Sequence, residues 1–299
     1  MYPARAVRII VPYGRDGASD RLGRAVGARL AQLWGVAVDY ENLPGAGTAI
    51  GMRRAADAPA DGYTLMLGTS TTHALAPALR GDLGFEPARA FAPLCMIGWS
   101  PNLLLSRRGL AAGVQELVAL ARARPGVLRY ASAGAGQTIH LCAELFARLA
   151  GVSLYHVPFE SGSMDGLKAL AAGRVDLMFD NVLAALPMLR ERQVEALGVA
   201  SSMPCAILPD LPTLAEAGVP GYSADIWLGL FAPAATPREV VGALERDVAT
   251  VLGQTDLVAE LRALGLMLDV QSGEDFAAEI AQNARDWQGI IALCGLHPA

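Results

Sequence analysis

Residues 128–149 read LRYASAGAGQTIHLCAELFARL. The segment opens with the short, mostly apolar run of a buried strand and continues through small, glycine-rich and hydroxylic residues. Ile139, Ala143 and Phe146 then recur at the spacing of one helix face. A strand, a tight loop and a helix leave backbone N–H groups unpaired at the helix start. Together with the positive end of the helix dipole, those donors favour a bound carboxylate or phosphate.

The same order of elements occurs nearer the N-terminus. A strand precedes the small-residue loop 13–19, which leads into an amphipathic helix from Asp20 to Trp34. Another hydroxyl-rich loop, 68–73, follows a further apolar strand. Ligands of α/β proteins bind beyond the carboxyl ends of strands. We therefore expect the three loops to line one cleft.

Strands alternate with helices along the chain, which predicts parallel sheets covered by helices. Two such runs in 299 residues indicate two lobes. The last helices need a sheet to pack on, and we place them on the first lobe. Thr236 and Glu239 have the spacing of a capping box for one of these helices. The prediction is an α/β fold in which each lobe is a mainly parallel sheet flanked by helices, with two crossover strands; lobe 1 comprises residues 1–101 and 225–299, and lobe 2 comprises 102–224.

The composition excludes several classes of protein. A hydrophobic content of 53% with 18% charged residues is typical of ordered domains, not of a disordered chain. The net charge of −5 argues against nucleic acid and against an anionic membrane as partners. No apolar run reaches the ~20 residues of a membrane helix. No basic and apolar leader follows Met1, so the chain is either cytoplasmic or a mature form whose signal peptide has been removed.

Neither the cysteines nor the histidines are spaced as metal ligands. No C-x-x-C pair occurs, so the four cysteines are expected to be free thiols. The four histidines show no ligand spacing either. We expect neither a metal nor a cofactor. The four cysteines are Cys95, Cys142, Cys205 and Cys294, and the four histidines are His73, His140, His156 and His297.

A series of short motifs, in order along nearly the whole chain, resembles one known family. The chain is similar to the substrate-binding receptors of tripartite tricarboxylate transporters, the Bug-type receptors. The resemblance implies a periplasmic, monomeric receptor with the two-lobed periplasmic-binding-protein (Venus flytrap) fold. Such a receptor is not an enzyme; it hands a small carboxylate to the membrane subunits of the transporter. The motifs lie at residues 11–12, 17–20, 41–47, 61–65, 130–134, 140–146, 156–159, 176–181, 208–213 and 227–230.

The resemblance also implies how the ligand is held. In the family, backbone groups and ordered waters from the loops after the first strands of each lobe bind the ligand carboxylate. Carried onto this sequence and joined with the loops described above, this gives a set of expected ligand-binding residues. They are Tyr13, Gly17, Ala18, Ser19, Thr69, Ser70, Thr71, Ser132, Gly134, Ala135, Gly136, Gln137, His140, Phe159, Glu160, Gly162, Ser163, Asp180 and Trp227.

Two loops depart from the family pattern. The first usually reads Ala-Pro-Gly-Gly, where this chain has Gly14-Arg15-Asp16-Gly17. The second usually carries Lys-Gly, where Glu160 stands here. The additional charge favours a ligand with a positive group as well as a carboxylate. A dicarboxylate, an amino acid and an aromatic acid all remain candidates.

The residues also permit other interpretations. Ser132, His140 and Asp180 are the residue types of a hydrolase triad, but no G-x-S-x-G motif is present. The glycine pairs at 14–17 and 134–136 do not complete a dinucleotide-binding motif. The alternative function is thus a cytoplasmic ligand sensor or hydrolase on the same fold. Asp180 is equally well explained as part of a helix cap, and Trp227 as hinge packing.

Overall fold

The computed structural model describes residues 2–15, 17–79, 83–159 and 162–295. The described chain divides into two compact units. Unit 1 is formed by the described residues of Met1–Trp99 and Trp227–Gln288, and unit 2 by those of Ser100–Ile226 and Gly289–His297. The predicted division differs from this one at the C-terminus. It places all of residues 225–299 in lobe 1, whereas the described residues of Gly289–His297 group with unit 2.

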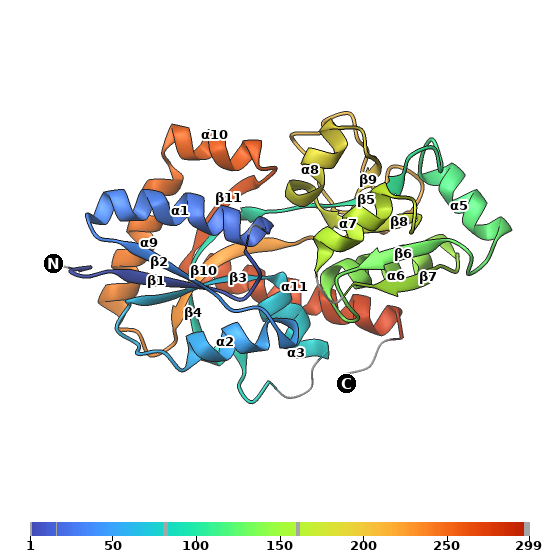
Figure 1. The fold of residues 1–299 in the computed structure, drawn as a ribbon. Coiled ribbons are helices and arrows are strands. Elements are labelled where there is room, and N and C mark those ends of the chain that lie inside the picture. The colour runs from blue at the N-terminus through green and yellow to red at the C-terminus, as the bar shows by residue number, and fades with distance from the viewer. Residues whose placement is uncertain (1, 16, 80–82, 160–161, 296–299) are drawn as a thin grey trace. The chain divides into compact units, whose positions relative to one another are not determined.

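Unit 1 is built on a six-stranded sheet with the strand order β11-β4-β10-β3-β1-β2 (Figure 1). Its strands are β1 (Val7–Val11), β2 (Val38–Asn42), β3 (Thr64–Thr69), β4 (Phe91–Trp99), β10 (Trp227–Pro233) and β11 (Met267–Ser272). Its helices are α1 (Ala18–Trp34), α2 (Ala49–Ala56), α3 (Ala76–Leu79), α4 (Pro87–Ala90), α9 (Arg238–Leu252), α10 (Thr255–Ala263) and α11 (Gly273–Leu293), with short turns η1 (Ala46–Thr48) and η2 (Thr71–Leu75). The end of α11 groups with unit 2.

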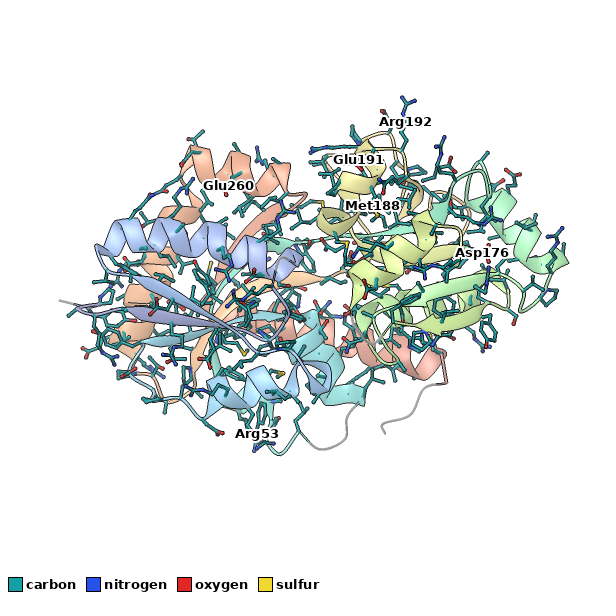
Figure 2. All side chains as sticks on the ribbon, in the orientation of Figure 1. Arg53, Asp176, Met188, Glu191, Arg192 and Glu260 are labelled. Carbon is teal, nitrogen blue, oxygen red and sulfur yellow. The ribbon has the colours of Figure 1, made fainter. Side chains whose placement is uncertain are left out.

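Helices cover both faces of this sheet, with α1 and α2 on opposite sides (Figure 1). As expected, the late helices pack on the first unit, where α9 and α10 contact α1. Arg29 of α1 forms ion pairs with Asp256 and with Glu260 of α10, at 2.9 and 3.2 Å. Glu260 is labelled on α10 in Figure 2. Helix α1 ends at Gly35, whose φ of 67° is readily adopted only by glycine.

Unit 2 is built on a five-stranded sheet with the order β7-β6-β8-β5-β9. Its strands are β5 (Asn102–Arg107), β6 (Arg129–Ser132), β7 (Tyr155–Pro158), β8 (Leu177–Asn181) and β9 (Val194–Val199). Its helices are α5 (Val114–Ala123), α6 (Thr138–Ala150), α7 (Ser163–Ala171) and α8 (Val182–Arg190). The core contains Leu103, Ala131, Leu167 and Met178, all fully buried.

The predicted fold of two helix-flanked α/β sheets is confirmed, and both sheets are mixed. In unit 1, β1 is parallel to β2 and β3, but β10 is antiparallel to β3 and β4. Unit 2 repeats this arrangement, with β5 antiparallel to β8 and β9. The reason lies in the crossovers. Strand β4 ends at Trp99 where the chain leaves unit 1, and β10 starts opposite it at Trp227 where the chain returns.

Two further expectations can be compared with the structure. All four cysteines are free, as expected. The capping box at Thr236 is wrong, because α9 begins after Pro237 and no side chain caps it. Thr236 stands one residue too early, and its buried hydroxyl has no hydrogen-bond partner among the described residues. No helix in the described ranges is long and apolar enough to cross a membrane.

Candidate functional site

Unit 1 brings the loops after β1 and β3 together, because these strands are parallel neighbours. Tyr13 follows β1, and its hydroxyl lies 2.5 Å from Oγ1 of Thr69, the last residue of β3. The same Oγ1 accepts the N–H of Thr71 at 3.1 Å. Burial raises the pKa of Tyr13 to about 12, so the phenol stays neutral and can donate. This places three of the expected residues at the carboxyl edge of the sheet.

The turn after β3 is fixed by its own side chains. Ser70 Oγ accepts the N–H of Trp227 at 3.0 Å, and Thr72 Oγ1 closes the turn by bonding both backbone groups of Thr69. Trp227 is fully buried and packs edge-on against Phe276 at 5.2 Å. Ser70 and Trp227 therefore support the core of unit 1, and their contact with a ligand stays a prediction.

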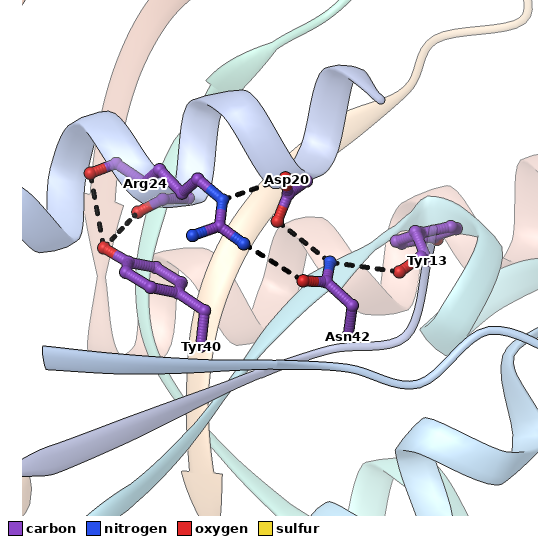
Figure 3. Close-up of polar contacts among 6 residues, drawn as sticks. Tyr13, Asp20, Arg24, Tyr40 and Asn42 are labelled. Carbon is purple, nitrogen blue, oxygen red and sulfur yellow. Dashed lines mark hydrogen bonds and ion pairs between the residues drawn. The ribbon is translucent and has the colours of Figure 1, made fainter. Parts of the chain in front are cut away.

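The start of α1 is held by a polar network (Figure 3). Asn42, at the end of β2, donates to the Tyr13 carbonyl at 3.2 Å and to Asp20 Oδ1 at 2.9 Å. Arg24 bonds Asp20 Oδ2 at 2.9 Å and Asn42 Oδ1 at 3.1 Å, and stacks over the Tyr40 ring. The expected residues Gly17, Ala18 and Ser19 lie at this helix start. Asp20 is thus committed to structure, while the first-turn N–H groups lack partners within α1.

Unit 2 carries the corresponding loop between β6 and α6. Ser132 ends β6, and its buried Oγ accepts the N–H of Gly134 at 3.1 Å. The N–H of Gly136 is directed to Nδ1 of His140 at 3.3 Å, and that of Gln137 to the Gly134 carbonyl at 3.4 Å. Gly134 and Gly136 have φ of 117° and 74°, which requires glycine.

These bonds change the expected source of ligand donors. The N–H groups of Gly134, Gly136 and Gln137 are already used within the loop. The first turn of α6, which begins at Thr138, supplies N–H groups that have no partner within the helix. Contact of this loop with a ligand stays a prediction, and these bonds shift the predicted donors toward the start of α6.

Behind the loop lies a stacked aromatic cluster. The rings of His140 and His156 are 4.4 Å apart, and Tyr130 stacks on His156 at 4.8 Å. The Tyr130 hydroxyl donates to Glu144 at 2.5 Å. Burial, and then the neighbouring His156, lower the pKa of His140 to about 4, so this imidazole is neutral near pH 7. The Gly136 N–H needs an unprotonated Nδ1 as its acceptor, and the neutral imidazole can provide one.

Asp180 and its neighbours complete the edge of unit 2. Asp180 lies near the end of β8, beside the parallel strand β6, and its pKa is raised by burial to about 7. Asn181, not Asp180, is the N-cap of α8, accepting the Leu183 N–H at 3.0 Å. Ser163 opens α7 after Gly162, and Phe159 packs on the core of unit 2. Glu160 lies outside the described residues.

The structure gives a different partner to Ser132 than the hydrolase interpretation requires. Its Oγ lies 2.6 Å from Nε2 of His156, not of His140. Ser132 is fully buried, and its hydroxyl also bonds the Gly134 carbonyl at 3.2 Å. Within the described ranges, no group of three or more His, Cys, Asp or Glu side chains could hold a metal ion.

His156 and Tyr130 support the loop, although neither is among the predicted site residues. Tyr130 and His156 are register partners on the parallel strands β6 and β7, which places their side chains on one face. The available signal was positional, since each residue stands two before the end of its strand.

Comparison with known proteins assigns the family. A protein encoded in the tcbD–tcbE intergenic region of Pseudomonas sp. (strain P51) is 34% identical over 292 residues, covering 97% of this chain and 86% of the relative. BugT of Bordetella pertussis is 29% identical over 296 residues, covering 98% and 90%. The family model described as the tripartite tricarboxylate transporter family receptor matches residues 22–296.

Solved structures agree with this assignment. An R. palustris protein with adipate has a TM-score of 0.94 at 35% identity and covers 100% of both chains. MatC from Rhodopseudomonas palustris with bound malate has a TM-score of 0.85 at 33% identity, covering 97% and 100%. The periplasmic binding protein BugD has a TM-score of 0.90 at 28% identity over both full chains. The fold is thus that of a periplasmic binding protein. The chain belongs to the tripartite tricarboxylate transporter receptor family, which consists of solute-binding receptors and not of enzymes.

Proposed function

We propose that this protein is a periplasmic receptor that captures one small carboxylate. It then delivers the ligand to the membrane subunits of a tripartite tricarboxylate-type transporter. The observation that supports this most strongly is the repeated construction of the two units. In each, a small-residue loop leads from a strand end to a helix start, at Gly17–Ser19 and at Ser132–Thr138. Two relatives were solved with adipate and malate, both carboxylates.

The chemistry of the two loops suits a carboxylate. Each helix start provides N–H donors and the positive end of a helix dipole. The Tyr13 hydroxyl bonds Thr69 Oγ1 at the strand edge of unit 1 and supports the loop there. Arg24, which follows the first turn of α1, is held by Asp20 and Asn42. In this proposal the N–H groups of the two helix starts are the main donors to the anion.

Thermal unfolding with a panel of acids tests this proposal. The protein is first freed of ligand by unfolding and refolding, and then mixed with adipate, malate, succinate, aspartate and glutamate. An acid at 100 times its Kd adds about 2.7 kcal/mol of stability. For a chain of this size that corresponds to a rise in Tm of roughly 5–10 °C. The matched diamides are the control and should give no rise. If no acid in a broad panel of small carboxylates raises Tm, the proposal is wrong.

The cellular part of the proposal has its own test. Osmotic-shock fractionation of cells that express the complete gene should release the protein with the periplasmic contents. The released protein should run as a monomer. Deletion of the gene should abolish uptake of the labelled acid that the thermal panel identifies. Retention in the cytoplasmic fraction would favour the alternative, a ligand sensor on the same fold.

A further inference from the structure

Asp180 occupies a position in unit 2 where a carboxyl group has an unusual environment. It lies in β8, opposite Leu103 of β5, and is 3% exposed. Its Oδ1 accepts the N–H of Asn181 at 2.8 Å. Its Oδ2 is buried and has no hydrogen-bond partner among the described residues. A buried polar atom of this kind is uncommon in native proteins and calls for a physical explanation.

The neighbouring polar groups leave Oδ2 without a partner among the described residues. The Asn181 amide donates to the Ser100 carbonyl and hydroxyl, and its Oδ1 caps α8 through the Leu183 N–H. The Ser163 hydroxyl and the Asn181 N–H are the groups that oppose the rise of the Asp180 pKa. Among the described residues, no arginine or lysine contributes to that pKa. In the part of the chain that the structure describes, the carboxyl group is therefore buried without a counter-ion.

Asp176, just before the same strand, shows how this chain supports an acid that serves the fold alone (Figure 2). Its two oxygens form ion pairs with Arg107 at 2.9 Å and Arg129 at 3.8 Å. Its Oδ2 also accepts the Arg129 N–H at 2.9 Å. Burying a carboxylate is costly unless it is paired in this way. Within the described ranges Asp180 has no such pair, and we take its partner to be a bound ligand.

The position of Asp180 relative to the β6–α6 loop identifies that partner. Strands β6 and β8 are parallel neighbours, with Ala131 opposite Met178. Asp180 and the start of the loop thus lie at the same strand edge, about 4.8 Å apart in the sheet direction. One small ligand can reach both if it carries a proton donor on the carbon next to its carboxylate. An ammonium group meets this condition with the right charge.

Resting on the proposed function, we infer that Asp180 is the specificity-determining residue of unit 2: it accepts the ammonium group of a small 2-amino acid whose carboxylate binds at the α6 start. A 2-hydroxy acid, which offers a neutral donor at the same carbon, binds more weakly. An unsubstituted acid leaves Oδ2 without a partner and binds most weakly.

Proton release provides a readout that a merely structural acid would not give. Because the pKa of Asp180 is raised to about 7, the free protein carries a mixture of protonated and ionised carboxyl groups at pH 7. An ammonium ligand selects the ionised form, so binding releases roughly half a proton at pH 7. The affinity for the amino acid then rises with pH up to about 8, whereas the affinity for the unsubstituted acid does not.

Titration calorimetry with matched ligands tests the inference on the full chain. The pairs are aspartate with succinate and glutamate with glutarate, and malate supplies the hydroxyl. Wild type should bind an amino acid at least tenfold more tightly than its partner. Asp180→Asn should lose that preference by 10- to 100-fold, with succinate and glutarate changed less than threefold. Asp165→Asn is the control, because Asp165 carries the same charge on α7 but pairs with Lys168, and it should behave as wild type.

The outcomes separate the inference from the proposed function. Binding of succinate as tight as that of aspartate, or equal losses for both in Asp180→Asn, overturns the inference and leaves the receptor function standing. Failure of every acid to bind contradicts the receptor function itself. If Asp180→Asn does not fold, calorimetry of wild type in buffers of different ionisation enthalpy decides. Absence of proton release with the amino acid at pH 7 then overturns the inference.

Discussion

His156 Nε2 lies 2.6 Å from Oγ of Ser132 and thereby joins β7 to the loop that follows β6. The Ser132 hydroxyl has a single proton, and its carbonyl partner is Gly134 O at 3.2 Å. Oγ also accepts the Gly134 N–H at 3.1 Å. One arrangement satisfies all three contacts: Ser132 donates to the carbonyl, and His156 carries a proton on Nε2 and donates to Oγ. The shape of the loop thus depends on a histidine of the neighbouring strand.

Replacing His156 should therefore affect binding through the loop. His156→Phe keeps a ring for Tyr130 and His140 to stack on but removes the donor to Ser132. We expect ligand affinity to fall by about three- to tenfold and the free energy of unfolding by about 1 kcal/mol, the usual value of one hydrogen bond. Calorimetry and urea unfolding measure the two effects. His156→Gln retains an N–H donor and should recover part of the affinity; equal affinity of the Phe variant and wild type would contradict this role.

Tyr13→Phe tests whether the Tyr13 hydroxyl serves the fold or the ligand. That hydroxyl lies 2.5 Å from Thr69 Oγ1, which also accepts the Thr71 N–H. We expect a loss of about 1 kcal/mol in unfolding free energy and less than a threefold loss of affinity. Thermal melts and calorimetry on the same sample distinguish the two. A tenfold loss of affinity with unchanged stability would instead make Tyr13 a direct ligand donor.

Asn42 should be more important to stability than any surface ion pair near it. Its side chain donates to the Tyr13 carbonyl and Asp20 and accepts from Arg24. Asn42→Ala removes all three bonds and should cost about 2–4 kcal/mol, with weaker ligand binding because the start of α1 is loosened. Arg8→Ala, which removes an exposed pair with Glu41 on the adjoining strands, is the control and should cost less than about 1 kcal/mol. Similar losses in both variants would contradict the network's role.

The order of elements and the position of the loops followed from local patterns. Helical spacing of apolar residues predicted α1 and α6, and glycine at 35 marked the end of α1. These features depend on residues a few positions apart, so the sequence contains them directly. The pairing direction of β5 and β10 does not, because it is set by where the chain leaves and re-enters each unit.

The chemistry of the loops was less predictable for a similar reason. The glycine-rich loop after β6 was expected to offer its N–H groups to a ligand, but Gly134 and Gly136 give theirs to Ser132 and His140. Those partners lie close in sequence, yet the choice of rotamer depends on packing against His156, which comes from another strand. The pKa values of His140 and Asp180 are also shifted by burial, and the sequence does not show directly how deeply a side chain is buried.

His73 should make the fold sensitive to acid. Its ring stacks on Phe231 at 3.9 Å, Nδ1 bonds Thr72 at 2.8 Å, and burial lowers its pKa to about 3. The unfolded chain has the ordinary value near 6.5 and so binds more protons than the folded protein between pH 3 and 6.5. The contribution of the neutral His73 to the free energy of unfolding is complete above pH 6.5. It is lost as the pH falls, by up to about 1.4 kcal/mol per pH unit.

His73→Phe keeps the stacking on Phe231 and removes the titrating group. Urea unfolding is measured at pH 4, 5, 6 and 7. At each lower pH the free energy of unfolding of the variant should rise relative to that of wild type. The difference curve isolates this group, because the other titrating residues are common to both proteins. Parallel curves for the two proteins would mean that His73 does not titrate in this range.

Asp180→Asn should give the opposite dependence on pH in the ligand-free protein. The pKa of Asp180 is raised from its ordinary value to about 7, so the folded protein binds more protons than the unfolded chain between about pH 4 and 7. Stability therefore falls as pH rises through this window, by up to about 1.4 kcal/mol per unit, and the full cost is present above pH 7. The Asn variant lacks this cost. In urea unfolding, its free energy of unfolding should therefore rise relative to that of wild type from pH 5 to pH 8. An amino-acid ligand at saturation should reduce that gain, since its ammonium group compensates the buried carboxylate. A difference that does not change with pH would show that Asp180 is ionised throughout and has a counter-ion within the protein.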